Sequence, residues 1–322
     1  MAQSLAALCI GFILDFILGD PHSLWHPVQG IGSLITGTEK VLRKVFPDKK
    51  KPLQIAGLLL VIFVASVSVL FAGLLLWIAE RIHPALGFGL SCILCWQMLA
   101  AKSLKTESMK VYTALEKEGL EAGRRAVSMI VGRDTKSLSE EGVIKAAVET
   151  VAENTSDGVT APLFYMMLAG PLGGVFYKAI NTMDSMIGYR NEKYRRLGTC
   201  AARLDDIANF IPARISALFM TAAAFVLGFD GKGAWKIYRR DRHNHKSPNA
   251  AQTEAVMAGA LQVQLAGDAW YFGELYKKPT IGDPIRSVRR EDIRAACRLE
   301  YGAVILQFLV MAAIKAALIF LI

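Results

Sequence analysis

The sequence predicts an all-α protein that crosses a membrane several times. Residues 53–79 and 302–322 form two long apolar runs, the first without a charged residue and the second interrupted only by Lys315. A helix needs about 20 mostly apolar residues to cross the bilayer core. Hydrophobic residues make up 53% of the chain, yet its formal net charge is +9. This combination indicates hydrophobic spans beside a basic polar surface.

Two shorter apolar runs add to the predicted spans. Residues 85–101 carry no charge, and residues 1–19 contain only Asp15 and no Lys or Arg. Because no basic residue precedes the first run, we expect it to remain attached rather than to be cleaved as a secretory signal. We therefore expect a polytopic protein with about four to six membrane-embedded helical segments. All of them are expected to belong to a single domain, residues 1–322.

The apolar segments 159–176 and 209–229 have a less certain course. The first contains Pro162, Gly170 and Pro171, and such backbone is tolerated at membrane depth only where protein or a cavity surrounds it. We expect it to be buried or re-entrant, and whether either segment crosses is left open. Six basic residues in 37–52, against Arg81 alone in 80–84, place 37–52 in the cytoplasm. The polar half, 102–301, is expected on the same side of the cell membrane.

Helical patterns continue through the polar half. Residues 102–130 are expected to be an amphipathic helix, and Ser137 with Glu140 has capping-box spacing for a helix that ends near Asn154. The next residues, "TSDG", are typical of a turn, and "EAVMAGALQVQLAG" predicts an apolar helix. No strand-like alternation of apolar and polar residues is present.

Several function classes are disfavoured by composition and motifs. The five cysteines are an odd number, and three lie in apolar runs, so no disulfide framework is implied. The chain has no G-x-x-x-x-G-K-[ST] motif, so a bound ATP would not be held by a P-loop. Aromatic residues do not interleave with the basic clusters, which argues against nucleic-acid binding.

Acidic residues recur at helical spacing. Glu149, Glu153 and Asp157 are four residues apart and would share one face of a continuing helix, where like charges repel. Either Lys145 or a divalent metal such as Mg²⁺ would offset them. Two further clusters follow in "NTMDSM" (Asn181, Asp184) and "LDDIAN" (Asp205, Asp206, Asn209). Each borders an apolar segment, where an unpaired carboxylate is costly and usually marks a functional site.

Basic residues are interleaved with these acids. They are Arg190, Lys193, Arg195, Arg196, Arg203 and Arg214, followed by "RRDRHNHKSPN" at 239–249. Arginine binds phosphate in fork geometry, so the alternation suits a metal-bridged phosphorylated substrate. A solvated face or a patch for anionic lipid is the alternative for the basic run.

The N-terminal stretch "GDPHSLWHPV" follows directly after an apolar run. His22 and His26 are four apart, but Pro21 and Pro27 limit helix formation across them, so a two-histidine metal site is weakly supported. Trp25 suits an interfacial anchor. Together with Asp15 and Asp20, the histidines are expected at the membrane boundary, as one wall of a site.

Four stretches carry a family resemblance. They are "DFILGDPHSLWHPVQGIG", "ENTSDGVTAPLFYMMLAGPLGG", "YKAINTMDSMIGYRNEKYRRLGTCAARLDDIANFIPARI" and "RRDRHNHKSPNAAQTEAVMAGALQVQLAG". In this order they resemble the adenosylcobinamide-phosphate synthase family of cobalamin biosynthesis (CobD/CbiB), from residue 15 to about residue 267. Ala251 is a departure where the family pattern leads us to expect glycine, and "LQVQLAG" is less glycine-rich than expected. These departures bear on how the turn after Asn249 is built.

The resemblance implies a multi-pass membrane enzyme, a ligase that forms an amide bond. It would join the carboxylate of adenosylcobyric acid, a corrinoid, to the amine of (R)-1-amino-2-propanol or its O-phosphate, giving adenosylcobinamide or its phosphate, with ATP and Mg²⁺. Which amine is used, and whether the protein forms homo-oligomers or associates with other cobalamin-assembly enzymes, is left open.

Roles for individual residues rest on this resemblance. Metal and phosphate organisation is assigned to Glu153, Asp157, Asp184, Asp205 and Asp206. Nucleotide binding is assigned to Arg190, Lys193, Arg203, Arg240, Arg242, Ser247 and Asn249. The candidates for catalytic proton transfer are His22, His26 and His243, because imidazole titrates near working pH, and Glu153 and Asp157 complete the catalytic set.

Two other classes compete with this interpretation. Intramembrane prenyltransferases also use acidic motifs and Mg²⁺, but they consume no ATP. A transporter would fit broken hydrophobic segments with embedded charge, and it predicts repeated halves, which the sequence does not show.

Overall fold

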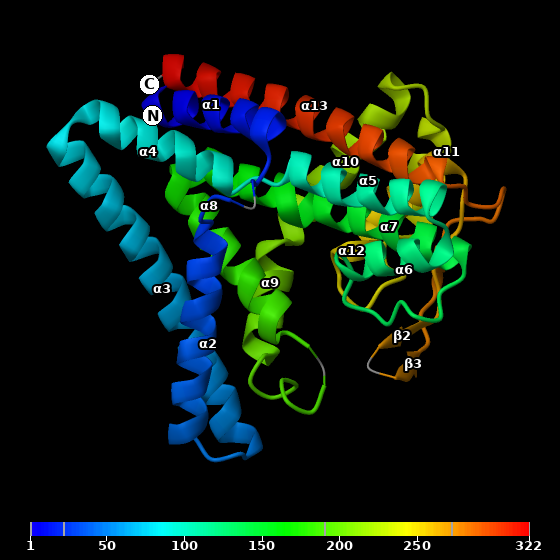
Figure 1. Cartoon of the computed structure of the whole chain (residues 1–322). Coiled ribbons are helices and arrows are strands. Elements are labelled where there is room, and N and C mark those ends of the chain that lie inside the picture. Colours follow the sequence, from blue (N-terminus) through cyan, green and yellow to red (C-terminus); the bar gives the residue numbers. More distant parts are fainter. Residues whose placement is uncertain (1, 22, 190, 272, 322) are drawn as a thin grey trace. The chain divides into compact units, whose positions relative to one another are not determined.

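The computed structural model confirms the all-α class (Figure 1) and describes residues 2–21, 23–189, 191–271 and 273–321. Four of the described helices are long and apolar enough to cross a membrane, and a fifth span is counted if one bent helix pair is taken as a single span. The chain divides into two compact units. Unit 1 consists of Met1–Ala100, Ala161–Asn209 and Met311–Ile322, and unit 2 of Ala101–Thr160 and Phe210–Val310.

Unit 1 contains most of the predicted N-terminal spans. Its helices are α1 (Ala2–Leu18), α2 (Pro27–Val45), α3 (Lys50–Ile82), α4 (Pro84–Gln97), α8 (Ala161–Ile187) and α9 (Thr199–Ala208). The predicted span 53–79 lies inside α3, where Ile55, Ile62 and Leu70 are exposed, as expected of a helix that faces lipid. Its opposite face packs Leu60 and Val64 into a core with residues of α2 and α8. The predicted spans 1–19 and 85–101 correspond to α1 and α4.

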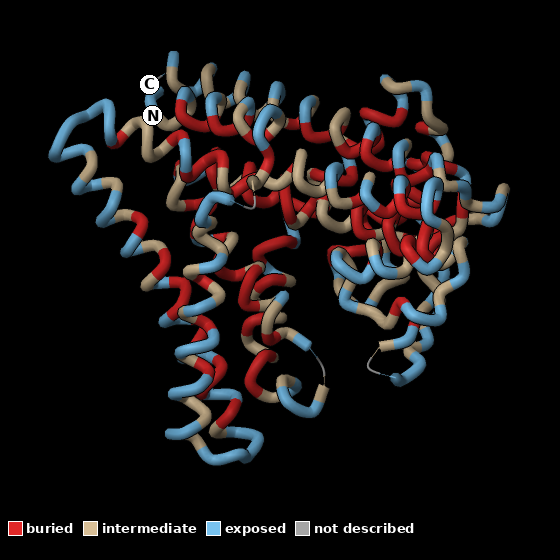
Figure 2. The backbone as a smooth tube through the Cα atoms, in the orientation of Figure 1, coloured by how far each residue is buried: buried red, intermediate tan, exposed pale blue. Residues whose placement is uncertain are grey.

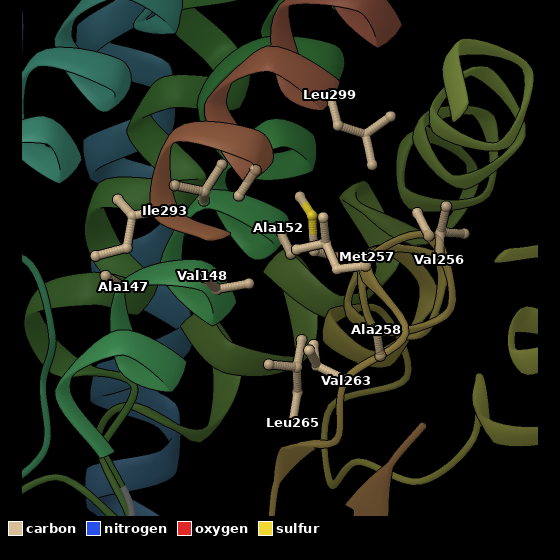
Figure 3. Packing of buried hydrophobic residues seen from close by; sticks show 14 of the residues in the cluster. Ala147, Val148, Ala152, Val256, Met257, Ala258, Val263, Leu265, Ile293 and Leu299 are labelled. Atoms are coloured by element: carbon tan, nitrogen blue, oxygen red, sulfur yellow. The ribbon is translucent and has the colours of Figure 1, made fainter. Parts of the chain in front are cut away.

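Unit 2 is built around a fully buried helix. Its elements are α5 (Ala101–Lys117), α6 (Leu120–Ser128), α7 (Glu140–Asn154), the π-helix η1 (Thr155–Thr160), α10 (Phe210–Val226), α11 (Gly231–Asp241), α12 (Ala250–Leu261) and most of α13 (Glu291–Leu321). Every residue of α12 is buried, within the part of the fold coloured red in Figure 2. Figure 3 shows Met257 and Val256 of α12 in the same cluster as Val148 of α7 and Leu299 of α13. The small residues of α12 allow this close packing on several sides.

Local details of the polar half differ from the sequence-based predictions. Ser139, not Ser137, caps α7 and accepts a hydrogen bond from Gly142 N at 3.1 Å. The predicted helix 102–130 is confirmed, but it breaks at Gly119, where φ is +86°. After Asn154 the chain forms a π-helix rather than a turn. In this π-helix the Thr155 hydroxyl donates to Val151 O at 2.7 Å. The helix α8 begins directly after it, at Ala161.

Two short antiparallel ladders follow α12 and were not predicted. β1 (Leu265–Ala266) pairs with β4 (Thr280–Ile281), and β2 (Ala269–Tyr271) pairs with β3 (Glu274–Tyr276). The helix predicted over "EAVMAGALQVQLAG" ends at Leu261, because Gln262 adopts a left-handed conformation with φ 59°. Strands of two or three residues are too short to give an alternating pattern.

The apolar segment 159–176 begins at the end of η1 and otherwise lies in α8, which bends at its glycine and proline residues. Ala169 and Gly170 leave helical geometry, and Pro171 follows them. The bend leaves carbonyl groups without helical partners, and Lys315 Nζ donates to one of them, Met167 O, at 2.7 Å. The stretch Glu140–Ile187 counts among the candidate spans by length and composition, so its predicted re-entrant course stays a prediction. The crossing of 209–229, which contains α10, also stays open.

Replacing Lys315 with methionine should destabilise unit 1. The substitution removes the donor to the Met167 carbonyl and leaves that carbonyl unsatisfied, at a cost of about 1–3 kcal/mol. Thermal unfolding in detergent micelles should show a lower midpoint for Lys315→Met than for Ile314→Met, a control at the neighbouring exposed position. Equal midpoints would show that this hydrogen bond does not stabilise the bend.

Candidate functional site

In unit 1, the motifs "NTMDSM" at the end of α8 and "LDDIAN" in α9 lie close together. Asp184 of α8 and Asp206 of α9 are close enough for their charges to repel. Asn181 Nδ2 lies 3.4 Å from Asp205 Oδ1, which links the same two helices. A side chain at Gly188 would collide with the Asp184 carboxylate, so glycine is needed to leave that group in place. The motifs "NTMDSM" and "LDDIAN", whose aspartates were assigned together to metal and phosphate, therefore lie side by side.

A pocket beside these aspartates carries both charges. Its lining consists of Gly188, Tyr189, Arg195, Thr199, Ala202, Arg203 and Asp206. Two guanidinium groups next to the Asp206 carboxylate suit a phosphate group accompanied by a cation. We refer to these lining residues as the arginine pocket.

Other residues assigned from the sequence have different surroundings in unit 1. Lys193 Nζ lies 3.9 Å from Glu39 Oε1 and 4.5 Å from the centroid of the Tyr194 ring. His26 is the N-cap of α2: its Nδ1 accepts from Val28 N at 3.2 Å, and its Nε2 lies 3.6 Å from Asp20 Oδ1. Arg190 and His22 lie outside the described residues. The catalytic and nucleotide roles of these side chains stay predictions.

In unit 2, the charge that offsets Glu149 comes from a distant arginine. Arg133 NH2 lies 2.8 Å from Glu149 Oε2, and both side chains are largely buried. Ala266 N also donates to Glu149 Oε1 at 2.8 Å. Lys145, one of the two partners considered from the sequence, instead pairs with Glu141 at 2.7 Å. That alternative was wrong because Lys145 reaches back one helical turn, toward the helix N-terminus.

The common helix face predicted for Glu149, Glu153 and Asp157 is only partly present. Glu149 and Glu153 lie on α7, but Asp157 lies in the π-helix η1. A π-turn spans more residues than an α-turn, so the spacing of four no longer keeps Asp157 in register.

Glu254 is a buried acid that the sequence analysis did not single out. It lies on α12 with 5% of its surface exposed, and its Oε2 has no hydrogen-bond partner within the described part of the chain. Burial, followed by the charges of Glu149 and Glu153, raises the pKa of Glu254 well above its ordinary value. Lys278 and Arg133 are close enough to oppose this effect. In the sequence, the signal that could have identified Glu254 was its position as an acidic residue within an apolar helical run.

The basic run before α12 is held in place by ion pairs and turns. Arg240 binds Asp241 through two hydrogen bonds of 2.7 and 2.8 Å and lies 2.8 Å from Asp283. These contacts raise the pKa of Arg240 and lower that of Asp241. Arg242 lies over the Tyr238 ring and donates to His243 Nε2 at 3.2 Å. Arg240 thus has a structural role in fixing the loop that contains Asp283.

The turn "SPN" leads into the N-terminus of α12. Asn249 N donates to Ser247 Oγ at 3.3 Å, and Arg214 NH1 lies 3.4 Å from Asn249 Oδ1. Gln252 Nε2 donates to the carbonyl groups of Arg242 and Pro248, both at 3.1 Å, and so ties the basic run to α12. The N-terminus of a helix favours anions, which agrees with the expected phosphate role of Ser247 and Asn249 but does not test it.

His245 should make the stability of unit 2 depend on pH. Burial, and then the charge of Lys278, lowers the pKa of His245 to about 4. The unfolded chain, with an ordinary histidine pKa, binds a proton at higher pH than the folded chain does. Stability should therefore be full above about pH 6.5 and fall toward pH 4, by up to about 3 kcal/mol. Urea titrations across this range should show a smaller decrease for His245→Phe, and the same decrease in both proteins would contradict the assignment.

The residues present are compatible with Mg²⁺ only in combination with a phosphorylated substrate. In the described ranges, no group of three or more His, Cys, Asp or Glu side chains is placed to hold a metal ion. Mg²⁺ commonly takes one or two carboxylates together with water and phosphate oxygens. The neighbouring carboxylates Asp184 and Asp206, beside the two arginines, supply such a partial set. The predicted ligands Glu153 and Asp157 stay predictions.

The fold and these charged sites define a helical membrane protein with acids and arginines gathered within each unit. A family model described as CobD/Cbib protein matches residues 8–300. The chain therefore belongs to the CobD/CbiB family, whose named members are cobalamin biosynthesis proteins. This confirms the family predicted from the four sequence stretches.

Curated relatives cover almost the whole chain. The Clostridium perfringens cobalamin biosynthesis protein CobD is 45% identical over 89% of this chain and 90% of its own. The CobD of Geobacter metallireducens is 46% identical over 94% of both chains. The Salmonella arizonae protein CbiB is 44% identical over 94% of both chains. No solved structure matches the chain.

Proposed function

We propose that this protein catalyses an ATP-dependent step of cobalamin biosynthesis, the amide bond between adenosylcobyric acid and aminopropanol or its O-phosphate. Membership of the CobD/CbiB family supports the pathway. The observation that carries the ATP-dependent chemistry is the arginine pocket, which contains Asp206, with Asp184 next to that carboxylate. Arginine forks and adjacent carboxylates are the groups that bind a nucleotide with its magnesium ion.

The need for ATP follows from the chemistry of the substrate. A carboxylate is a poor electrophile, so its oxygen first attacks the terminal phosphorus of ATP, forming an acyl phosphate and releasing ADP. The amine nitrogen then attacks the acyl carbon, the C–O bond to phosphate breaks, and the products are the amide, inorganic phosphate and a proton. In this scheme Arg195 and Arg203 orient the phosphates and offset their charge. Mg²⁺, held by Asp184 and Asp206, would supply further positive charge beside the phosphate oxygens.

The active site is proposed to face the cytoplasm, where ATP and both co-substrates are available. This orientation rests on the basic segment 37–52, which spans the end of α2 and the start of α3. In this proposal the protein lies in the bilayer and takes the corrinoid as its large substrate.

An omission experiment separates the candidate functions. The purified full-length protein in lipid discs should hydrolyse ATP only when adenosylcobyric acid and the amine are both present, and mass spectrometry should show the amide. A prenyltransferase would consume a prenyl diphosphate without ATP, and a transporter would release no amide. Amide formation without ATP, or ATP hydrolysis that is independent of the amine, would refute the proposal.

A further inference from the structure

The segment between α8 and α9 supplies part of the arginine pocket. Its described part contributes Gly188, Tyr189 and Arg195 to the lining. The main chain of Arg195 is held on both sides, because its N–H donates to Asn191 O at 2.9 Å and its carbonyl oxygen accepts from the Thr199 hydroxyl at 2.7 Å. The position of the Arg195 guanidinium group therefore depends on where this segment lies.

Arg43 of α2 binds the same segment directly. Its Nε donates to Glu39 Oε1 at 2.8 Å on its own helix, and its Nη2 donates to the carbonyl oxygen of Lys193 at 2.8 Å. The guanidinium carbon also lies 5.7 Å from the centroid of the Tyr194 ring. Arg43 thus contacts the two residues that precede Arg195. The Glu39 side chain, which is 12% exposed, sets the direction of the Arg43 fork.

The end of the segment packs against α3. Leu197 is fully buried beside Leu53 and Ala56 of that helix. A side chain at Gly57 would collide with the Leu197 carbonyl oxygen, so glycine is needed for the two backbones to approach this closely. The segment is therefore fixed by α2 before Arg195 and by α3 after it.

The two arginines of the pocket differ in what holds them. Arg203 lies on the helix α9, whereas Arg195 lies outside any helix. Their like charges repel each other when no anion lies between them. The placement of Arg195 therefore depends on contacts with other helices more than that of Arg203 does.

We propose that Arg43 is a positioning residue for the arginine pocket: together with Glu39 it holds the segment so that Arg195 meets the phosphate groups of the nucleotide. This inference rests on the proposed function for the identity of those phosphate groups. Arg43 is not among the described residues that line the pocket, so it acts through Arg195 rather than on the ligand.

Nucleotide binding tests this role without turnover. The probe is adenylyl imidodiphosphate, a non-hydrolysable ATP analogue, added with Mg²⁺ to the full-length protein in lipid discs without corrinoid or amine. Arg43→Lys keeps the charge but has one donor nitrogen in place of two, so the analogue should bind about tenfold more weakly than to the wild type. Lys44→Met, which removes a charge from the neighbouring exposed position of α2, should bind it like the wild type.

A double-mutant cycle with Arg195→Met separates positioning from an independent effect. If Arg43 acts through Arg195, adding Arg43→Lys to Arg195→Met should cause no further loss of affinity. Losses that multiply would overturn the inference, and so would wild-type affinity in Arg43→Lys alone.

Hydrogen exchange of the wild type needs no variant and tests the inference even if Arg43→Lys does not fold. The amide protons of Arg195 and Gly198, which donate to Asn191 O and Tyr194 O, should exchange slowly before any nucleotide is added. Exchange as fast as in an unstructured peptide would show that the segment is not held in place, which would overturn the inference.

Turnover distinguishes failure of this inference from failure of the proposed function. Arg43→Lys should raise the KM for ATP about tenfold, whereas a merely destabilising substitution would lower kcat through a smaller folded fraction and leave KM unchanged. Amide synthesis with an unchanged KM for ATP in Arg43→Lys would refute the positioning role alone. Analogue binding that weakens in Arg43→Lys, without any amide synthesis by the wild type, would refute the proposed function alone.

Discussion

Replacing Asp206 with asparagine should reduce amide synthesis by about 100-fold or more. The substitution keeps the size of the side chain but removes one negative charge from the arginine pocket, next to Asp184. Loss of a single charged or polar group that stabilises a transition state commonly costs a factor of this order. Initial rates with saturating ATP and amine, measured on the purified protein in lipid discs, would give the ratio.

The control for this experiment is Asp48→Asn in the same unit. Asp48 is 88% exposed, and its contact with Arg196 at 3.5 Å is a surface pair, so its loss should leave the rate nearly unchanged. A wild-type rate for Asp206→Asn in folded protein would remove Asp206 from the catalytic machinery. Equal rate losses for both variants would point to a general loss of folding instead.

Replacing Arg133 with methionine should lower the free energy of unfolding of unit 2 by about 3–5 kcal/mol. The Arg133 and Glu149 side chains are 12% and 14% exposed, so methionine would leave the Glu149 carboxylate largely buried without its counter-charge. The double variant Arg133→Met with Glu149→Gln should recover most of the loss, because glutamine keeps an acceptor for Ala266 N without the charge. Urea unfolding in detergent micelles measures each step of this double-mutant cycle.

Lys145→Met provides the comparison for the Arg133 variant. Lys145 pairs with Glu141, which is 57% exposed, and such pairs contribute at most about 1 kcal/mol. Similar losses for Lys145→Met and Arg133→Met would show that burial of the Arg133–Glu149 pair has no special effect.

Much of the fold follows from local properties of the sequence. The apolar run 53–79 predicts α3 because hydropathy and length alone decide whether a helix can cross a bilayer. The meeting of Asp184 with Asp206 was also accessible, since both motifs flank one short polar segment between two helices. The family could be predicted from four stretches of the sequence, and the family model that matches residues 8–300 confirms it.

The remaining features depend on contacts between distant parts of the chain. Arg133 pairs with Glu149 across the Ser139 cap, and no helical spacing relates the two residues. Glu254 stands alone in an apolar helix, so its neighbours on α7 become visible only when α12 packs against that helix. The π-helix after Asn154 depends on hydroxyl and backbone contacts that compete closely with a turn, and "TSDG" by composition favours the turn.

The most direct test of the account follows one oxygen atom. Adenosylcobyric acid labelled with ¹⁸O in its free carboxylate is converted by the wild-type protein in lipid discs with ATP, Mg²⁺ and the amine. If ATP activates the carboxylate as proposed, one labelled oxygen should leave with inorganic phosphate, in step with amide formation. Amide formed while the released phosphate carries no label would contradict the account.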